Sequence, residues 1–263
     1  MKQDQNTDPL HNGFKARLRD RGARMAGLWL QIPSSITAEA LAYSDFDWLL
    51  IDAEHAPNEL HTLLPQLQAI AAGGSEPIVR PSWNDFVLLK RLLDIGVRSF
   101  LIPFVQNADE ARQAVRAVRY PPDGIRGIAS CHRGNRYGHM PDYLKRANEE
   151  VCVIVQIETR TAAENVSDIA SVPGVDAVFV GPSDLSASMG HIGNPSHPEV
   201  QSVIDGVLAQ CGALGTPVGI YASGPDDARA RFDAGFRFAS IGADLSTMIK
   251  ACEKLLQTVR DRK

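Results

Sequence analysis

The sequence predicts a (β/α)8 barrel, in which eight parallel strands are each followed by a helix. Eight short apolar runs alternate with eight segments of helical periodicity over 263 residues, a length typical of one such barrel. Most runs are apolar at successive positions, as expected for parallel strands buried on both faces. No linker, repeat or change in composition divides the chain, so we expect residues 1–263 to form a single domain. The alternative, a doubly wound open sheet, needs fewer strands for this length.

The predicted strands are short and rich in β-branched or aromatic residues. In chain order they cover residues 26–30, 47–51, 77–80, 98–102, 151–157, 176–180, 217–221 and 236–241. The helices predicted between and after them cover residues 34–44, 57–72, 84–95, 107–119, 159–171, 198–214, 225–234 and 244–260. Asn84, Asn107 and Ser223 stand where helix caps are expected, which supports the starts of three of these helices.

Three segments lie outside this alternation. Residues 1–13 are polar, and we expect them to be frayed. Residues 120–148 are too many for an ordinary connection from a strand to a helix, and they are rich in Gly, Arg and His, which is typical of a functional loop. Residues 190–198 are expected to form a second, ordered loop.

The composition disfavours several classes of function. Lys and Arg number 27 against 31 Asp and Glu, so a net charge of −4 gives no basic excess for binding nucleic acid or an anionic membrane. No apolar run approaches the ~18 residues of a membrane span, and the N-terminus has no apolar signal region. The cysteines are widely spaced and form no CxxC pair, which predicts reduced thiols in a cytoplasmic protein; they are Cys131, Cys152, Cys211 and Cys252.

Polar residues that follow the predicted strands are the candidates for chemistry, because the C-terminal ends of barrel strands converge on one mouth. These residues are Gln31, Asp52, Glu54, His55, Arg80, Gln156, Glu158, Asp184 and Tyr221. None of the seven lysines follows a strand, which disfavours a mechanism that forms a Schiff base with the substrate. The chain also has no GxGxxG or GxxxxGK[ST] motif, so no loop for nucleotide phosphates is predicted.

Glu158 and Asp184 follow neighbouring strands, so their carboxylates are expected to lie within reach of one cation. Ligation by oxygen atoms with open positions suits Mg²⁺, Mn²⁺ or Co²⁺, with water and substrate as further ligands. The alternative is structural: Glu158 caps the helix 159–171, and Asp184 caps the turn that follows its strand.

His55 stands three residues after Asp52, and a carboxylate within reach of an imidazole fixes its tautomer and raises its basicity, as a general base requires. The alternative is a histidine that bonds only a loop carbonyl. Arg80 ends an otherwise apolar strand and therefore needs an anionic partner. That partner is either an enolate or carboxylate of a ligand, or an ion pair with Glu158 or Asp52.

Six ordered blocks of the sequence resemble the class II pyruvate-dependent aldolases of the HpcH/HpaI family. The resemblance runs from about Gly27 to Leu245. The blocks are FDWLLIDAEHAPN (46–58), VRPSWND (79–85), VQNADEAR (105–112), RYPPDGIRG (119–127), VQIETR (155–160) and GVDAVFVGPSDLSASMG (174–190). The resemblance implies a divalent-metal-dependent barrel enzyme that splits a 4-hydroxy-2-keto acid into pyruvate and an aldehyde.

The resemblance also implies roles for particular residues. Glu158 and Asp184 match the two carboxylates that bind the metal ion. His55 matches the catalytic histidine, with Asp52 as its orienting partner. Arg80 matches the arginine that contacts pyruvate and its enolate.

Other matched positions concern the substrate and the assembly. Gln156 matches a glutamine beside the keto acid, and the backbone amides of Ser183 and Asp184 match the cradle for its carboxylate. Trp29 and Tyr221 match positions that line the pocket for the acceptor aldehyde. The family's hexamers are trimers of dimers that exchange the last helix, which implies a homo-oligomer contact for residues 244–260.

Two features depart from the family pattern, and both bear on the acceptor. The loop after RGIAS reads CHRGNRYGHM (131–140) instead of an Ala-rich sequence, and Tyr221 stands where an aliphatic residue is frequent. In a hexamer we expect this loop to reach the mouth of its own or a neighbouring barrel, where Arg133, together with Tyr221, would favour short polar acceptors. The alternative is that the arginines of the loop pair with surface carboxylates. Two other functions stay open: a CoA-thioester lyase of the malyl or citramalyl type on the same scaffold, and a metal-binding barrel without turnover.

Overall fold

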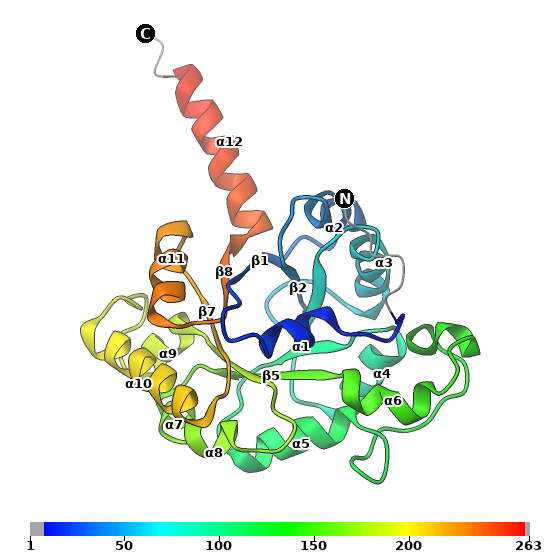
Figure 1. Ribbon diagram of the computed structural model, residues 1–263. Helices are drawn as coiled ribbons and strands as arrows, with labels where there is room; N and C mark the ends of the chain where they lie inside the picture. Colours follow the sequence, from blue (N-terminus) through cyan, green and yellow to red (C-terminus); the bar gives the residue numbers. More distant parts are fainter. Residues whose placement is uncertain (1–7, 261–263) are drawn as a thin grey trace.

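The computed structural model describes residues 8–260, and the eight strands among them form one closed, all-parallel barrel in chain order (Figure 1). The strands are β1 (Met25–Leu30), β2 (Trp48–Asp52), β3 (Glu76–Arg80), β4 (Ser99–Ile102), β5 (Cys152–Ile157), β6 (Ala177–Val180), β7 (Val218–Tyr221) and β8 (Phe238–Ala243). The predicted (β/α)8 barrel is confirmed. The open-sheet alternative is excluded because β8 pairs with β1.

Helices follow the strands and surround the barrel. They are α2 (Ser35–Ala42), α3 (Leu60–Ile70), α4 (Phe86–Asp94), α5 (Ala108–Val118), α7 (Arg160–Glu164), α8 (Val166–Ala170), α10 (Pro198–Leu214), α11 (Pro225–Ala234) and α12 (Asp244–Arg260). The last three match the predicted ranges in full, whereas the predicted helix 159–171 is broken into α7 and α8. Asn107 caps α5 as predicted, but Asp85 instead of Asn84 caps α4, and Gly224 instead of Ser223 precedes α11.

Four short helices were not predicted: α1 (Gly13–Leu18), η1 (Arg133–Gly138), α6 (Tyr143–Glu150) and α9 (Pro182–Ser188). Residues 8–12, just before α1, are held against the barrel, which corrects the expectation of a frayed end for this part of residues 1–13; residues 1–7 lie outside the described residues. Leu10 is buried, and the side-chain amide of Asn12 donates hydrogen bonds to Ser99 Oγ at 3.0 Å and to the Glu150 carbonyl at 2.9 Å.

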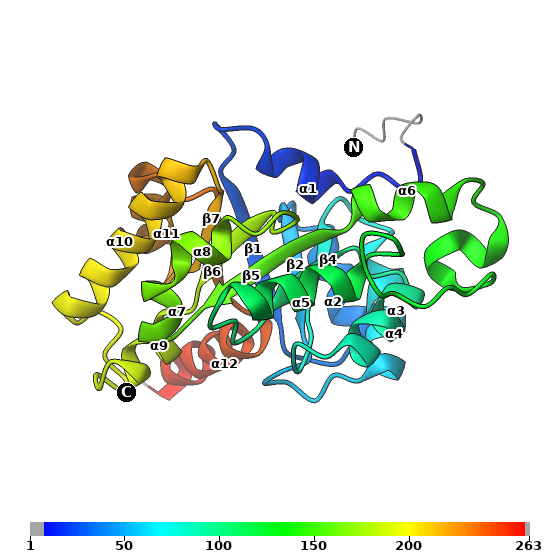
Figure 2. The same cartoon turned by 90° about the horizontal axis from the view of Figure 1, so that it is seen from below.

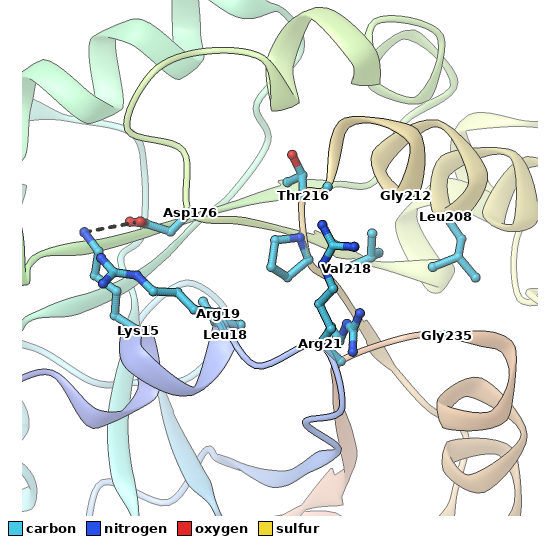
Figure 3. Close-up of a pocket in the computed structure, with 13 residues that line it drawn as sticks. Lys15, Leu18, Arg19, Arg21, Asp176, Leu208, Gly212, Thr216, Val218 and Gly235 are labelled. Atoms are coloured by element: carbon cyan, nitrogen blue, oxygen red, sulfur yellow. Dashed lines mark ion pairs between the residues drawn. The ribbon is translucent and has the colours of Figure 1, made fainter.

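Helix α1 closes the N-terminal end of the barrel. The buried ring of Phe14 lies edge-on to Phe238, with ring centroids 5.4 Å apart. Lys15 donates from Nζ to the Val151 carbonyl at 2.7 Å and forms an ion pair with Asp176 at 3.2 Å. A pocket of ≈430 Å³ lies beside this ion pair (Figure 3), at the end of the barrel where the strands begin.

Aromatic side chains fill the barrel interior. Trp48, Phe179 and Phe238 are buried there, and Trp48 lies over Gly27 of the neighbouring strand. A Cβ atom at position 27 would lie 2.1 Å from the Trp48 ring, so only glycine leaves room for the indole at this level. Burial of these large rings is the main stabilising contribution inside the barrel.

The segment 120–148 lies at the N-terminal end of the barrel, because it connects α5 to β5. Figure 2 shows α6 on the same side of the molecule as α1 and away from α12. The segment therefore connects a helix to a strand and does not lie at the mouth of its own barrel.

The seam between β1 and β8 closes the barrel next to α12. The Asp244 carboxylate accepts hydrogen bonds from the backbone N–H groups of Gln31 at 2.8 Å and Ile32 at 3.2 Å. Beyond Asp244, α12 extends away from the barrel (Figure 1). Its exposed apolar side chains are Leu245, Met248, Ile249, Leu255, Leu256 and Val259.

Two further properties concern the whole described range. Within residues 8–260, every helix is too short or too polar to cross a lipid bilayer. The four cysteines are free thiols, and burial raises the pKa values of Cys152 and Cys211. The two buried thiols are therefore protonated and unreactive.

Candidate active site

A pocket of ≈190 Å³ opens at the C-terminal ends of the strands. Eight of the residues predicted from the sequence line it, which are Trp29, Gln31, His55, Arg80, Gln156, Ser183, Asp184 and Tyr221. Phe179, Gly181 and Pro182 complete the lining. The strand ends therefore bring together most of the predicted site, as expected for a barrel mouth.

Arg80 is the buried cation of this pocket. Its Nε and Nη2 atoms donate to the two oxygens of Asp52 at 2.9 and 2.8 Å, and Nη1 lies 2.8 Å from Glu54 Oε2. Burial by itself lowers the pKa of Arg80, but the hydrogen bonds and charge of Asp52 and then the charge of Glu54 raise it above its ordinary value. The guanidinium is therefore permanently charged and held in one orientation.

The position of Asp52 corrects its predicted role as the partner of the His55 ring. Both oxygens of Asp52 bond Arg80, and Oδ1 also accepts the backbone N–H groups of Glu54 at 3.0 Å and His55 at 3.4 Å. The physical reason lies in the sheet register, because Asp52 and Arg80 are directly paired residues on β2 and β3. The pairing of Arg80 with Asp52 was one of the alternatives left open for Arg80, and the structure shows that alternative.

The His55 ring is exposed at the wall of the pocket, with 63% of its side chain accessible. The nearest carboxylate oxygen is Glu54 Oε2, 3.9 Å from His55 Nε2. Glu54 follows the same strand and is one of the polar candidates predicted from the sequence, although no role was assigned to it. Burial raises the pKa of Glu54, and the positive charge of Arg80 opposes this shift only in part.

Glu158 is buried beneath the pocket wall. Its Oε1 accepts the backbone N–H of Phe104 at 2.8 Å, and its Oε2 accepts Gln156 Nε2 at 2.5 Å. Burial, opposed by the Phe104 hydrogen bond and strengthened by the charges of Glu54 and Asp184, raises the pKa of Glu158 to about 7. Glu158 does not cap the following helix, because Thr159 fills that position.

Asp184 lies in the first turn of α9 and is exposed to the pocket. Gly181, which precedes α9, allows this helix to approach Glu158: a Cβ atom there would lie 2.9 Å from Gln156 Nε2 and 3.2 Å from Glu158 Oε2. The close approach gathers two carboxylates on one side of the pocket.

An aromatic wall lies on the other side of the pocket. The rings of Trp29 and Tyr221 meet edge to face with centroids 5.2 Å apart, and Trp29 also contacts Phe179 at 5.6 Å. The Arg80 guanidinium lies 5.3 Å from the Trp29 ring centroid. Burial raises the pKa of Tyr221, so its hydroxyl stays protonated and can donate a hydrogen bond into the pocket.

Arg133 does not belong to the mouth of its own barrel, which corrects its prediction as a residue that binds substrate there. Its Nη1 atom donates to the Ile95 carbonyl at 2.8 Å, and its Nη2 donates to the Leu67 carbonyl at 3.4 Å. Both carbonyls lie where helices lead into strands, at the end opposite the pocket. Arg133 instead holds the segment 120–148 against the N-terminal end of the barrel.

A closed (β/α)8 barrel with buried carboxylates and an arginine at its mouth defines the class, a barrel enzyme with an acidic site for a small ligand. The chain belongs to the HpcH/HpaI aldolase/citrate lyase family, whose model matches residues 25–251. It is 52% identical over 247 residues to the 4-hydroxy-2-oxo-heptane-1,7-dioate aldolase of Escherichia coli (strain ATCC 8739), and the match covers 94% of each chain.

Solved structures are similar over nearly the whole chain. An HpcH/HpaI aldolase/citrate lyase family protein from Burkholderia cenocepacia J2315 is 44% identical with a TM-score of 0.92, covering 95% of this chain and 100% of that one. An HpcH/HpaI aldolase from Desulfitobacterium hafniense is 27% identical with a TM-score of 0.85, covering 92% and 95%. The predicted family and enzyme class, a carbon–carbon lyase of the aldolase type, are confirmed.

Proposed function

We propose that the pocket catalyses the reversible cleavage of a 4-hydroxy-2-keto acid to pyruvate and an aldehyde. The observation that carries this proposal is a charged arginine and the carboxylate of Asp184 lining one small cavity, with Glu158 buried behind its wall against Gln156. An enolate of pyruvate is a small anion, and this arrangement offers it both a fixed cation and a site for a metal ion.

The donor set fits a divalent ion that prefers oxygen ligands. Glu158 and Asp184 together repel each other's negative charge, which is one reason why the pKa of Glu158 is raised to about 7, and a divalent cation would remove that penalty. We propose that these two residues hold Mg²⁺, Mn²⁺ or Co²⁺. When bound, the ion supplies Lewis-acid polarisation of the substrate's keto group.

Arg80 stabilises the negative charge that develops on the enolate oxygen. A guanidinium has five N–H donors, and the hydrogen bonds to Asp52 occupy two of them, which leaves donors for the ligand. Asp52 and Glu54 are positioning residues, since they fix the orientation of Arg80 before the substrate arrives. Gln156 and the first turn of α9 at Ser183 line the same cavity and are the proposed contacts of the keto acid.

His55 is the proposed general base. Its ring lies at the pocket wall and makes no hydrogen bond to Asp52, so it is free to accept the proton of the substrate's C4 hydroxyl. As that proton leaves, the C4–O bond becomes a carbonyl, the C3–C4 bond breaks, and its electron pair forms the enolate. Protonation of the enolate at C3 then gives pyruvate.

The aldehyde portion of the substrate lies against Trp29 and Tyr221 in this proposal. Both rings line the pocket, and the Tyr221 hydroxyl offers a polar contact that an aliphatic residue would lack. Because the Escherichia coli relative is named for 4-hydroxy-2-oxo-heptane-1,7-dioate, we propose that this diacid is a substrate of the present enzyme.

We also propose a homo-oligomer, a hexamer built as a trimer of dimers. The exposed apolar face of α12 supports this assembly, and so does an apolar groove of ≈440 Å³ between α2 and the start of α12. A partner helix in such a groove would bury both surfaces. The free thiols agree with a reducing compartment, and we propose the cytoplasm.

One experiment tests the proposed reaction. The purified protein, stripped of metal by a chelator, is given the 4-hydroxy-2-keto diacid, and pyruvate release is followed with and without Mg²⁺, Mn²⁺ or Co²⁺. We expect no release without metal, release with at least one ion, and none from the Asp184→Asn variant under any of them. Full activity in chelator, or trapping of pyruvate on a lysine by borohydride, would overturn the proposal.

A further inference from the structure

His191, His197 and Glu199 lie together where the loop after α9 leads into α10, outside the pocket described above. One ring nitrogen of each histidine and one carboxylate oxygen of Glu199 lie within 4.8 Å of one another. His191 Nε2 is 3.0 Å from Glu199 Oε2, and the two imidazole rings are stacked with centroids 3.5 Å apart. The proposed reaction uses none of these three side chains.

The backbone of this loop is fixed by its own hydrogen bonds. The His191 N–H donates to the Ser186 carbonyl at 2.7 Å, and the Asn194 N–H donates to the His191 carbonyl at 2.9 Å. The His197 N–H donates to the Asn194 carbonyl at 3.1 Å, and the Glu199 N–H donates to His197 Nδ1 at 3.2 Å. The three side chains are therefore presented together by a backbone that is already ordered.

The carboxylate of Glu199 has a separate neighbour at each oxygen. Arg160 donates to Oε1 at 2.6 Å, and His191 Nε2 lies 3.0 Å from Oε2. Both imidazole rings are partly exposed, so an ion from solution reaches them without opening the fold. Glu199 Oε1 bonds Arg160, whereas Oε2 faces His191 and is the oxygen that an ion would use.

We propose that His191, His197 and Glu199 form a second metal site, which takes a borderline divalent ion such as Zn²⁺. Two imidazole nitrogens and one carboxylate oxygen, with water in a fourth position, form a ligand set that suits Zn²⁺ and does not suit Mg²⁺. Ligation requires the stacked rings to splay, because nitrogen lone pairs lie in the ring planes. The ion then replaces the hydrogen bond between His191 and Glu199, and only side chains rotate.

The histidine cluster lies next to a cavity that adjoins the active-site pocket, so an ion bound there would affect the structure near the active site. Pro195 and Ser196, which lie between the two histidines in the chain, line a pocket of ≈440 Å³ that also includes Pro182, Ser183 and Tyr221. The last two also line the active-site pocket. A metal ion at the cluster would therefore restrain the loop that contains Pro195 and Ser196. This loop lines a cavity next to the proposed binding site of the aldehyde.

Zinc binding to the Asp184→Asn protein tests the site apart from the proposed catalytic metal. The full-length variant is stripped with chelator and titrated with Zn²⁺ by calorimetry, and its thermal unfolding is followed with and without the ion. We expect one Zn²⁺ per chain and a raised unfolding temperature. Adding His191→Ala or Glu199→Gln should weaken Zn²⁺ affinity at least about tenfold and remove the rise in unfolding temperature.

His61→Ala is the matched control, because His61 is another exposed histidine and belongs to a different helix. It should leave Zn²⁺ affinity unchanged. The proposal is overturned if the Asp184→Asn protein binds no Zn²⁺, or if it binds Zn²⁺ equally well after His191→Ala and after Glu199→Gln. His197 is not used in the test because it also caps α10, so its replacement would weaken the helix itself.

Discussion

At the scale of single residues, the site depends on carboxylates whose environments differ. Asp52 is fully buried but neutralised by Arg80, whereas Glu158 is buried beside other negative charges. The first therefore serves as a fixed anchor for a cation. The second is partly protonated near neutral pH in the metal-free protein, and this difference can be measured.

The raised pKa of Glu158 should make the metal-free protein less stable as the pH rises. The folded protein keeps this proton up to a pH of about 7, whereas the unfolded chain loses it near 4.5, so the folded state binds more protons between these values. The free energy of unfolding should fall from pH 4.5 to pH 7, by about 3 kcal/mol at most. Urea unfolding in the presence of a chelator measures this free energy at each pH. The decrease between pH 4.5 and pH 7 should be smaller for the Glu158→Gln variant. An equal pH dependence of the two proteins would contradict the assignment.

Metal affinity should depend on the same proton. Because the ion needs the ionised carboxylate, Mn²⁺ binding should weaken as the pH falls below about 7. Calorimetric titrations at pH 6 and pH 8 measure the change, and proton release on binding should be larger at pH 6. Binding that is independent of pH across this range would show that Glu158 is not a ligand.

His55 and Asp52 should differ in which reaction they affect. His55→Ala removes the proposed base, so cleavage of the aldol substrate should fall by about 10²- to 10⁴-fold. Decarboxylation of oxaloacetate also passes through the pyruvate enolate but removes no hydroxyl proton, so it should be affected much less. Asp52→Asn should slow both reactions, because Asp52 holds Arg80 on the enolate side. The two activities are assayed side by side, and a loss confined to aldol cleavage in Asp52→Asn would restore the predicted pairing with His55.

At the scale of elements, the strand and helix pattern was predictable because buried parallel strands are continuously apolar. Boundaries shifted by only one or two residues at each strand, and the barrel mouth followed from chain order alone. Two site predictions failed for different reasons. The partner of Asp52 depends on the register between β2 and β3, which adjacency in sequence does not reveal. Arg133 lies away from the mouth of its own barrel, because a segment that leads from a helix to a strand belongs to the opposite end. Its contact with a neighbouring barrel of an oligomer stays a prediction.

A strained residue just after β4 donates a hydrogen bond to Glu158. Phe104 has a φ of 57°, and its backbone N–H bonds the Glu158 carboxylate. This left-handed conformation costs a side-chain-bearing residue about 1–2 kcal/mol but costs glycine little. Phe104→Gly should therefore be more stable than Phe104→Ala by about 1 kcal/mol, as measured by urea unfolding, although both lose the ring contact with Trp83. An alanine variant at least as stable as the glycine variant would contradict this account.

At the scale of the whole molecule, α12 is the element that the barrel alone does not explain. Leu255 and Val259 are 70% and 72% exposed, near the far end of the helix. Their replacement by lysine should lower the molar mass measured by light scattering, because the proposed subunit contact requires an apolar helix face. Gln257→Lys, which adds a charge on another side of the same helix, is the control and should leave the assembly intact. An unchanged molar mass in Leu255→Lys/Val259→Lys would remove α12 from the interface.

The pairing of β1 with β8, which Asp244 supports, also determines when the barrel can close during synthesis of the chain. The first strand to leave the ribosome finds one partner, β2, early, but it must wait for the last strand, β8, before its other edge is covered. Contacts between such distant parts of a chain form slowly, because a long loop must close before they contribute any stability. The barrel can therefore close only when synthesis is nearly complete. The hydrogen bonds from the backbone N–H groups of Gln31 and Ile32 to the Asp244 carboxylate are among the last to form. Until then the growing chain carries an uncovered strand edge, which is the state most vulnerable to association with other chains.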